Sequence, residues 1–164
     1  MPRLWPSALV TSDGERFVLI GRHVVRRLER FLAQDKGTSE AGGVLLGFRR
    51  GAHLEVLSAT LPSSQDGRTR FSFVRRGESH QRVTTRTWKR SGCLVDYLGE
   101  WHSHPQEFPT PSGIDRREMI RRSCAHREEM LLELIVGECG VYAAVVDQGR
   151  YAALKVVSVT DRGC

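Results

Sequence analysis

The sequence predicts a single α/β (α+β) domain in which a mixed β-sheet is flanked by about three helices. Its length of 164 residues is enough for one compact domain with a hydrophobic core. Hydrophobic residues make up 40% of the chain and charged residues 27%, the balance of an ordinary globular protein. Short apolar runs typical of strands alternate with three segments of helical period, which predicts the mixed class.

The first part of the chain predicts a strand followed by an amphipathic helix. Residues 1–13 contain two prolines and are expected to form an irregular lead-in to a domain of residues 14–160, with residues 161–164 as a short tail. Residues 15–21 (ERFVLIG) have the composition of a strand. In residues 22–34 the apolar side chains recur at helical spacing and share one face. That face consists of Val24, Val25, Leu28, Phe31 and Leu32.

The middle of the chain predicts three strands, a polar loop and a second helix. Residues 42–48 and 53–59 are apolar runs joined by a turn, which indicates two strands. Residues 61–70 are polar and predict a loop, and residues 71–74 (FSFV) predict a short strand. Residues 78–90 predict a helix with a basic stripe, which indicates a solvated face or, as the alternative, a contact with a partner. The stripe consists of Arg82, Arg86 and Arg90, at positions i, i+4 and i+8.

The last part of the chain predicts a strand, a third helix and three closing strands. Residues 97–104 (YLGEWHSH) resemble a strand, and a proline-rich loop separates them from a helix that runs from Ser112 to about Arg127. The apolar runs LLELIVG, VYAAVVD and YAALKVVSV then predict three strands.

Composition limits the classes of partner. No run approaches roughly 18 consecutive apolar residues, so no membrane span is predicted. The N-terminus lacks the apolar stretch of a secretory signal, and we expect a cytoplasmic protein. The net charge is +6 and the pI about 9.6, but the arginines are spread over several segments. Without a recognisable nucleic-acid-binding motif, an acidic protein partner explains this charge at least as well as nucleic acid does.

The cysteines and four of the histidines have no spacing that indicates chemistry. The cysteines form no CxxC pair and are interpreted as reduced, partly buried thiols; they are Cys93, Cys124, Cys139 and Cys164. Four histidines belong to no cluster and are interpreted as surface or incidental residues; they are His23, His53, His80 and His126.

The segment GEWHSHPQEFPTPSGID, residues 99–115, carries the candidate chemistry. His102 and His104 are two residues apart and would point to the same face of a strand. Ser112 and Asp115 are three residues apart in a first helical turn, where Ser112 is a suitable N-cap. Two imidazole nitrogens and one carboxylate oxygen would leave one ligand position open. Catalytic zinc sites have this arrangement, with water as the fourth ligand.

Each part of this pattern also has a purely structural interpretation. Most HxH pairs are surface or core histidines, and Ser-x-x-Asp at a helix start is often only a cap. The combination favours a metal site, because seven residues separate His104 from Ser112 and Asp115 follows three positions later. Glu100 shares the strand face of His102 and is interpreted as a salt-bridge partner, and Trp101 is expected to point into the core.

These residues resemble the JAMM signature of the JAB/MPN zinc metallopeptidases, HxH-x7-Sx2D. The family also has a glutamate at the edge of an early strand, and Glu40 in SEAGGVLLG matches it. The resemblance implies a cytidine-deaminase-like MPN/JAB fold and one Zn²⁺ per chain, bound by His102, His104 and Asp115. It also implies that Glu40 acts as the general base and that Ser112 stabilises the oxyanion.

The wider segment LGEWHSHPQEFPTPSGIDR is similar to the prokaryotic JAB deconjugating peptidases of CBASS antiphage operons. This similarity implies an isopeptidase that cleaves after the C-terminus of a conjugated protein, a cyclic-nucleotide synthase (CD-NTase) bound through its extended C-terminal tail. Processing of a ubiquitin-like or sulfur-carrier precursor is an alternative within the same class. A non-catalytic MPN scaffold and a RadC-like DNA-associated protein are alternatives of another class, and DNA binding would have to weaken with added salt.

Overall fold

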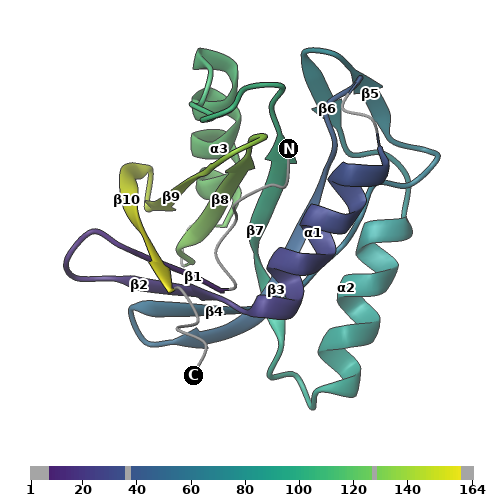
Figure 1. The fold of residues 1–164 in the computed structure, drawn as a ribbon. Coiled ribbons are helices and arrows are strands. Elements are labelled where there is room, and N and C mark those ends of the chain that lie inside the picture. The colour runs from purple at the N-terminus through teal and green to yellow at the C-terminus, as the bar shows by residue number, and fades with distance from the viewer. Residues whose placement is uncertain (1–7, 36–37, 127–128, 160–164) are drawn as a thin grey trace, which may run out of the picture.

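A computed structural model describes residues 8–35, 38–126 and 129–159, which form ten strands and three helices (Figure 1). In chain order these are β1 (Ala8–Ser12), β2 (Phe17–Ile20), α1 (Arg22–Gln34), β3 (Gly42–Arg50), β4 (His53–Ala59), β5 (Gly67–Thr69), β6 (Ser72–Val74), α2 (Ser79–Arg90), β7 (Asp96–Ser103), α3 (Gly113–Ala125), β8 (Leu131–Val136), β9 (Val141–Asp147) and β10 (Arg150–Val159). The predicted mixed sheet with about three helices is confirmed. None of the described helices is long and apolar enough to cross a membrane.

Eight of the strands form one closed mixed sheet. They follow each other in the order β1-β10-β9-β8-β7-β3-β4-β2, and β1 pairs with β2 to close the ring. The β2–β4 and β7–β8 pairs are parallel, whereas the other neighbours are antiparallel. β5 and β6 pair only with each other and form a separate hairpin. In Figure 1 this hairpin lies near the C-terminal end of α1.

Two predicted boundaries are wrong. Ala8–Ser12 are part of the sheet as β1, although residues 1–13 were expected to be an irregular lead-in. This strand is short, and its partner β10 is more than a hundred residues away in the chain. The local sequence therefore does not reveal it. The expected polar loop of residues 61–70 contains the three-residue strand β5, whose polar sequence GRT carries no strand pattern. Residues 1–7 and the expected tail, 161–164, lie outside the described residues.

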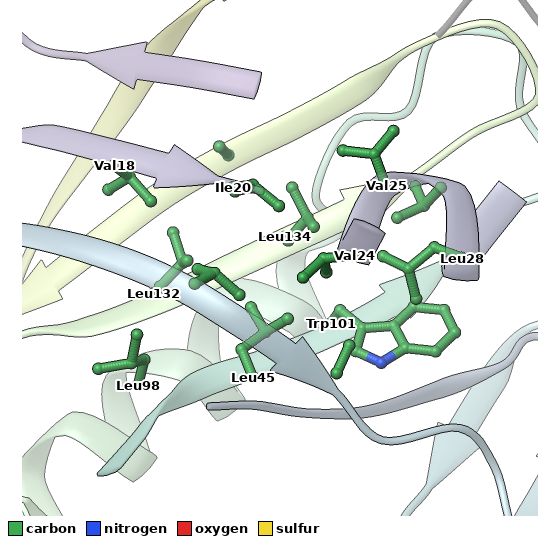
Figure 2. Packing of buried hydrophobic residues seen from close by; sticks show 14 of the residues in the cluster. Val18, Ile20, Val24, Val25, Leu28, Leu45, Leu98, Trp101, Leu132 and Leu134 are labelled. Carbon is green, nitrogen blue, oxygen red and sulfur yellow. The ribbon is translucent and has the colours of Figure 1, made fainter. Parts of the chain in front are cut away.

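The core lies between α1 and the inside of the closed sheet, as Figure 2 shows. Four residues of the predicted helical face are buried, and Phe31 is partly buried against them. Trp101 is 1% exposed, as expected, and its indole N–H donates to the carbonyl oxygen of Thr60 over 2.8 Å. The packing fixes β7, which carries His102 and is followed directly by His104.

The second helix covers the outside of the sheet with few buried contacts. His80 is its only buried residue, and the predicted basic stripe of Arg82, Arg86 and Arg90 is exposed. The cysteine interpretation needs a correction, since the three described cysteines are exposed and form no disulfide. These are Cys93, Cys124 and Cys139, while Cys164 lies outside the described residues.

Candidate metal centre

His102 and His104 converge at the end of β7. Their side chains are 12% and 10% exposed, and their Nε2 atoms lie 3.1 Å apart. The two imidazoles therefore lie on the same face, as predicted, because residues two apart on an extended chain share a face. His104 follows the last residue of β7, and its backbone N–H donates to the carbonyl oxygen of Val136 on β8, which fixes it in line with the strand.

Asp115 approaches both histidines from the first turn of α3. Its Oδ1 lies 3.6 Å from Nε2 of His102 and its Oδ2 lies 3.4 Å from Nε2 of His104. Ser112 is the N-cap, as predicted, and it forms a capping box with Asp115. The backbone N–H of Asp115 donates to Ser112 Oγ over 3.1 Å, and the backbone N–H of Ser112 donates to Asp115 Oδ2 over 2.6 Å. The cap thus orients the carboxylate toward the histidines.

The three donor groups fit a tetrahedral zinc ion. Zinc–ligand bonds of about 2.0–2.1 Å place tetrahedral donor atoms about 3.3–3.4 Å apart. The two Nε2 atoms lie 3.1 Å apart, within a few tenths of an ångström of that value, and each lies 3.4–3.6 Å from one of the two carboxylate oxygens of Asp115. Two nitrogens and one oxygen are also a donor set that zinc accepts, and all three ligand atoms lie within 4.8 Å of one another.

Glu40 approaches His104 from the segment just before β3. β3 pairs antiparallel with β7 so that Gly42 lies opposite His102, and the same register places Glu40 opposite His104. Glu40 Oε1 lies 3.9 Å from His104 Nε2. A cavity of about 30 Å³ opens beside these two side chains, which is room for water next to the carboxylate. Burial raises the pKa of Glu40 above its ordinary value, although His104 and His102 oppose this effect.

Sequence reasoning did not identify Glu133, which orients His102 from the neighbouring strand β8. Its Oε1 lies 2.9 Å from His102 Nδ1, which leaves Nε2 directed at the metal position. Glu133 is 4% exposed and is the one charged residue of the buried strand LLELIV. That was the available signal, because a carboxylate in an apolar strand needs a buried partner.

Arg122 on α3 connects Glu133 to a second glutamate. Its guanidinium lies 2.7 Å from Glu133 Oε2 and 3.5 Å from Glu100 Oε2. Glu100 also pairs with Arg75 at 3.0 Å, which confirms the interpretation of Glu100 as a salt-bridge partner. The network anchors the carboxylate that contacts His102.

The acidic side chains around the centre stabilise positive charge between them. Burial alone lowers the pKa of His102, but hydrogen bonds and charge from Asp115 and Glu133 raise it to about 9. Burial raises the pKa of Asp115, but hydrogen bonds with His102, His104 and Ser112 outweigh burial and hold that pKa far below its ordinary value. The same concentration of carboxylates would favour a divalent cation at the centre.

His80 is not the surface or incidental residue that the sequence suggested. It is 2% exposed, and its Nε2 lies 2.9 Å from Asp66 while its Nδ1 lies 2.6 Å from Thr60 Oγ1. Asp66 also accepts hydrogen bonds from the backbone N–H groups of Ser63 and Arg76, which precede β5 and follow β6. His80 therefore fixes the base of the β5–β6 hairpin to α2. The partners are distant in sequence, which is why spacing did not reveal them.

A family model described as prokaryotic homologs of the JAB domain matches residues 23–151. The chain belongs to this JAB-domain family. The expected resemblance to prokaryotic JAB proteins is confirmed.

Relatives of this JAB domain include proteins named as peptidases. A CD-NTase/cGAS isopeptidase of Vibrio cholerae is 43% identical over 126 residues, which are 77% of this chain and 80% of that protein. A CD-NTase/cGAS isopeptidase of Pseudomonas aeruginosa is 32% identical over 85% of this chain and 89% of its own length. A probable metalloprotease of Sinorhizobium fredii is 34% identical over 60% of this chain and 63% of its own.

A solved structure supports the fold alone. The solution structure of a protein from Desulfitobacterium hafniense superimposes with a TM-score of 0.50 at 20% identity, and the match covers 79% of this chain and 86% of that one.

Proposed function

We propose that this protein is a zinc-dependent isopeptidase that cleaves after the C-terminus of a conjugated protein. The observation that supports it best is the convergence of His102, His104 and Asp115 at zinc-ligand spacing beside Glu40. Relatives that are similar over most of the chain are named isopeptidases, which supports a protein substrate. One Zn²⁺ per chain would be held by the two histidines and the aspartate.

The residues around the ion can carry out amide hydrolysis. Zinc, when bound, supplies a Lewis acid that polarises the scissile carbonyl and lowers the pKa of water. Glu40 lies beside the cavity, where its carboxylate can accept a proton from water and later pass it to the leaving amine. The Oγ of Ser112 accepts a hydrogen bond from the backbone of Asp115, so its own proton is available to donate to the oxyanion.

We propose a CD-NTase of a bacterial CBASS antiphage system as the conjugated protein. The names of the Vibrio cholerae and Pseudomonas aeruginosa relatives support this substrate. Its extended C-terminal tail would reach the metal centre, and the bond cut after that tail could be isopeptide or linear peptide. The polar segment 61–70 and the basic stripe of Arg82, Arg86 and Arg90 are the surfaces that we assign to substrate recognition.

A fusion of a CD-NTase to a small reporter protein tests this proposal. The purified, zinc-loaded enzyme and its Glu40→Ala variant are each incubated with the fusion, and the product masses are measured. Cleavage immediately after the synthase C-terminus by the wild-type protein alone supports the proposal. An intact fusion, together with trimming of a ubiquitin-like precursor in a parallel reaction, would instead assign a processing role.

A further inference from the structure

The backbone of Glu40 is held by β5 of the hairpin. β3 begins at Gly42, so Glu40 precedes the regular hydrogen bonding between β3 and β7. Its backbone N–H donates to the carbonyl oxygen of Thr69 over 2.7 Å, and its own carbonyl oxygen accepts from Arg68 Nε over 2.9 Å. Arg68 also donates to the carbonyl oxygen of Ser39 over 3.3 Å. Within the described part of the chain, every hydrogen bond to the backbone of Ser39 and Glu40 comes from β5.

Arg68 is itself fixed by groups outside the hairpin. Its two terminal nitrogens donate to Asp35 Oδ1 over 3.0 Å and to Asp35 Oδ2 over 2.5 Å. Asp35 is the C-cap of α1, and the Arg68 guanidinium carbon also lies 5.9 Å from the ring centre of Phe31 on that helix. Phe31 contacts Trp101 of the core edge to face. The guanidinium therefore connects a rigid helix end to the backbone of Glu40.

The hairpin can approach this segment closely because the strand after Glu40 begins with glycine. A Cβ atom at Gly42 would lie 2.4 Å from the ring of Phe73 on β6, which is far inside van der Waals contact. β6 thus packs directly on the start of β3. Asp66 and His80 fix the base of the same hairpin, so β5 is a firm support for Arg68.

We propose that Arg68 is the positioning residue for Glu40, acting through the backbone of residues 39 and 40. This inference rests on the proposed role of Glu40 as the general base. Arginine suits the task because its planar fork can donate to the Asp35 carboxylate and to two carbonyl oxygens at once. A lysine could keep the ion pair with Asp35, but one ammonium group on a flexible stem could not reproduce the whole set of contacts.

The experiment compares Arg68→Ala, Arg68→Lys and Arg50→Ala, using cleavage of the reporter fusion by the zinc-loaded protein. Arg50 is a matched control, because it is an exposed arginine that pairs with a carboxylate, Glu55, at 2.9 Å. A base displaced by about 1 Å can lose on the order of 10²-fold in rate. We therefore expect kcat to fall about 10- to 100-fold in both Arg68 variants, with KM and zinc content unchanged. Arg50→Ala should match the wild type.

Chemical rescue separates positioning from a general loss of structure. Millimolar guanidinium should restore part of the kcat of Arg68→Ala but not that of Arg68→Lys, and sodium chloride at the same ionic strength should restore neither. Normal kcat in Arg68→Ala, while Glu40→Gln is inactive, would overturn the role of Arg68 and leave the proposed function intact. An active Glu40→Gln would overturn both. A rise in KM alone would assign Arg68 to substrate binding and would also refute the inference.

Discussion

Replacement of Glu133 by glutamine tests how the centre holds its metal. The substitution keeps the size of the side chain but removes the charge that lies 2.9 Å from His102 Nδ1 and 2.7 Å from Arg122. Loss of a partner that orients a metal-ligating histidine typically weakens metal binding 10- to 100-fold, or about 1.4–2.8 kcal/mol. We expect zinc binding to weaken by an amount within this range, because Glu133 is 4% exposed and water cannot easily replace its carboxylate.

The assay is competition for zinc against a chelating dye of known affinity, with Glu118→Gln as the control. Glu118 also pairs with an arginine, Arg121, at 2.7 Å, but both side chains are exposed. Glu133→Gln should also unfold at lower temperature, since Arg122 loses a buried charged hydrogen bond worth about 1–3 kcal/mol. Zinc affinity within twofold of the wild type would refute the reasoning, because it would show that the negative charge of Glu133 does not strengthen zinc binding.

Three further predictions concern the division of roles in the site and the support of the hairpin. Glu40→Gln should retain zinc but lose on the order of 10²–10⁴-fold in turnover. His104→Ala should lose zinc and activity together. Elemental analysis measures the zinc content of both variants, and the cleavage assay measures their turnover. Blocking the exposed cysteines with an alkylating reagent should leave turnover unchanged, and inactivation without zinc loss or unfolding would contradict this. Asp66→Asn should destabilise the protein by about 1–3 kcal/mol at neutral pH. Denaturant unfolding at several pH values should show that this difference disappears in acid.

The pH dependence of the stability that Asp66 contributes follows from the contacts of its carboxylate. Burial raises the pKa of Asp66, but hydrogen bonds from the backbone N–H of Arg76, from His80 and from the backbone N–H of Ser63 lower it below the ordinary value. A carboxyl whose pKa is lower in the folded state stabilises the fold above its unfolded pKa, about 4 for aspartate. That contribution is lost as the pH falls through the folded pKa. A constant difference between wild type and Asp66→Asn down to strongly acidic pH would contradict this explanation.

The convergence of His102, His104 and Asp115 could be predicted from sequence because their geometry is local. A spacing of two residues on a strand, or of three in a first helical turn, fixes the relative directions of two side chains without knowledge of the fold. Glu40 is different, since only the antiparallel register of β3 and β7 places it opposite His104. Its assignment came from resemblance to a family, and the structure supplies the physical reason.

The supporting residues escaped sequence analysis because their partners lie far away in the chain. Glu133 meets His102 across a parallel strand pair, and His80 meets Asp66, which lies just before β5 in the segment that was expected to be a polar loop. The strand β1 was missed for the same reason, because β10 supplies its pairing. Local spacing indicates which side chains share a face, but closure of the sheet decides which distant faces meet.

The two halves of the centre are supported by different parts of the fold, so we expect metal affinity and reactivity to respond to different substitutions. The ligands on β7 and α3 are held by the capping box of Ser112 and by the Glu133–Arg122 pair. The backbone of Glu40 depends instead on β5, which reaches the end of α1 through Arg68. A change that displaces the hairpin should therefore alter turnover while zinc stays bound. A change at Glu133 should weaken zinc binding and leave Glu40 in place.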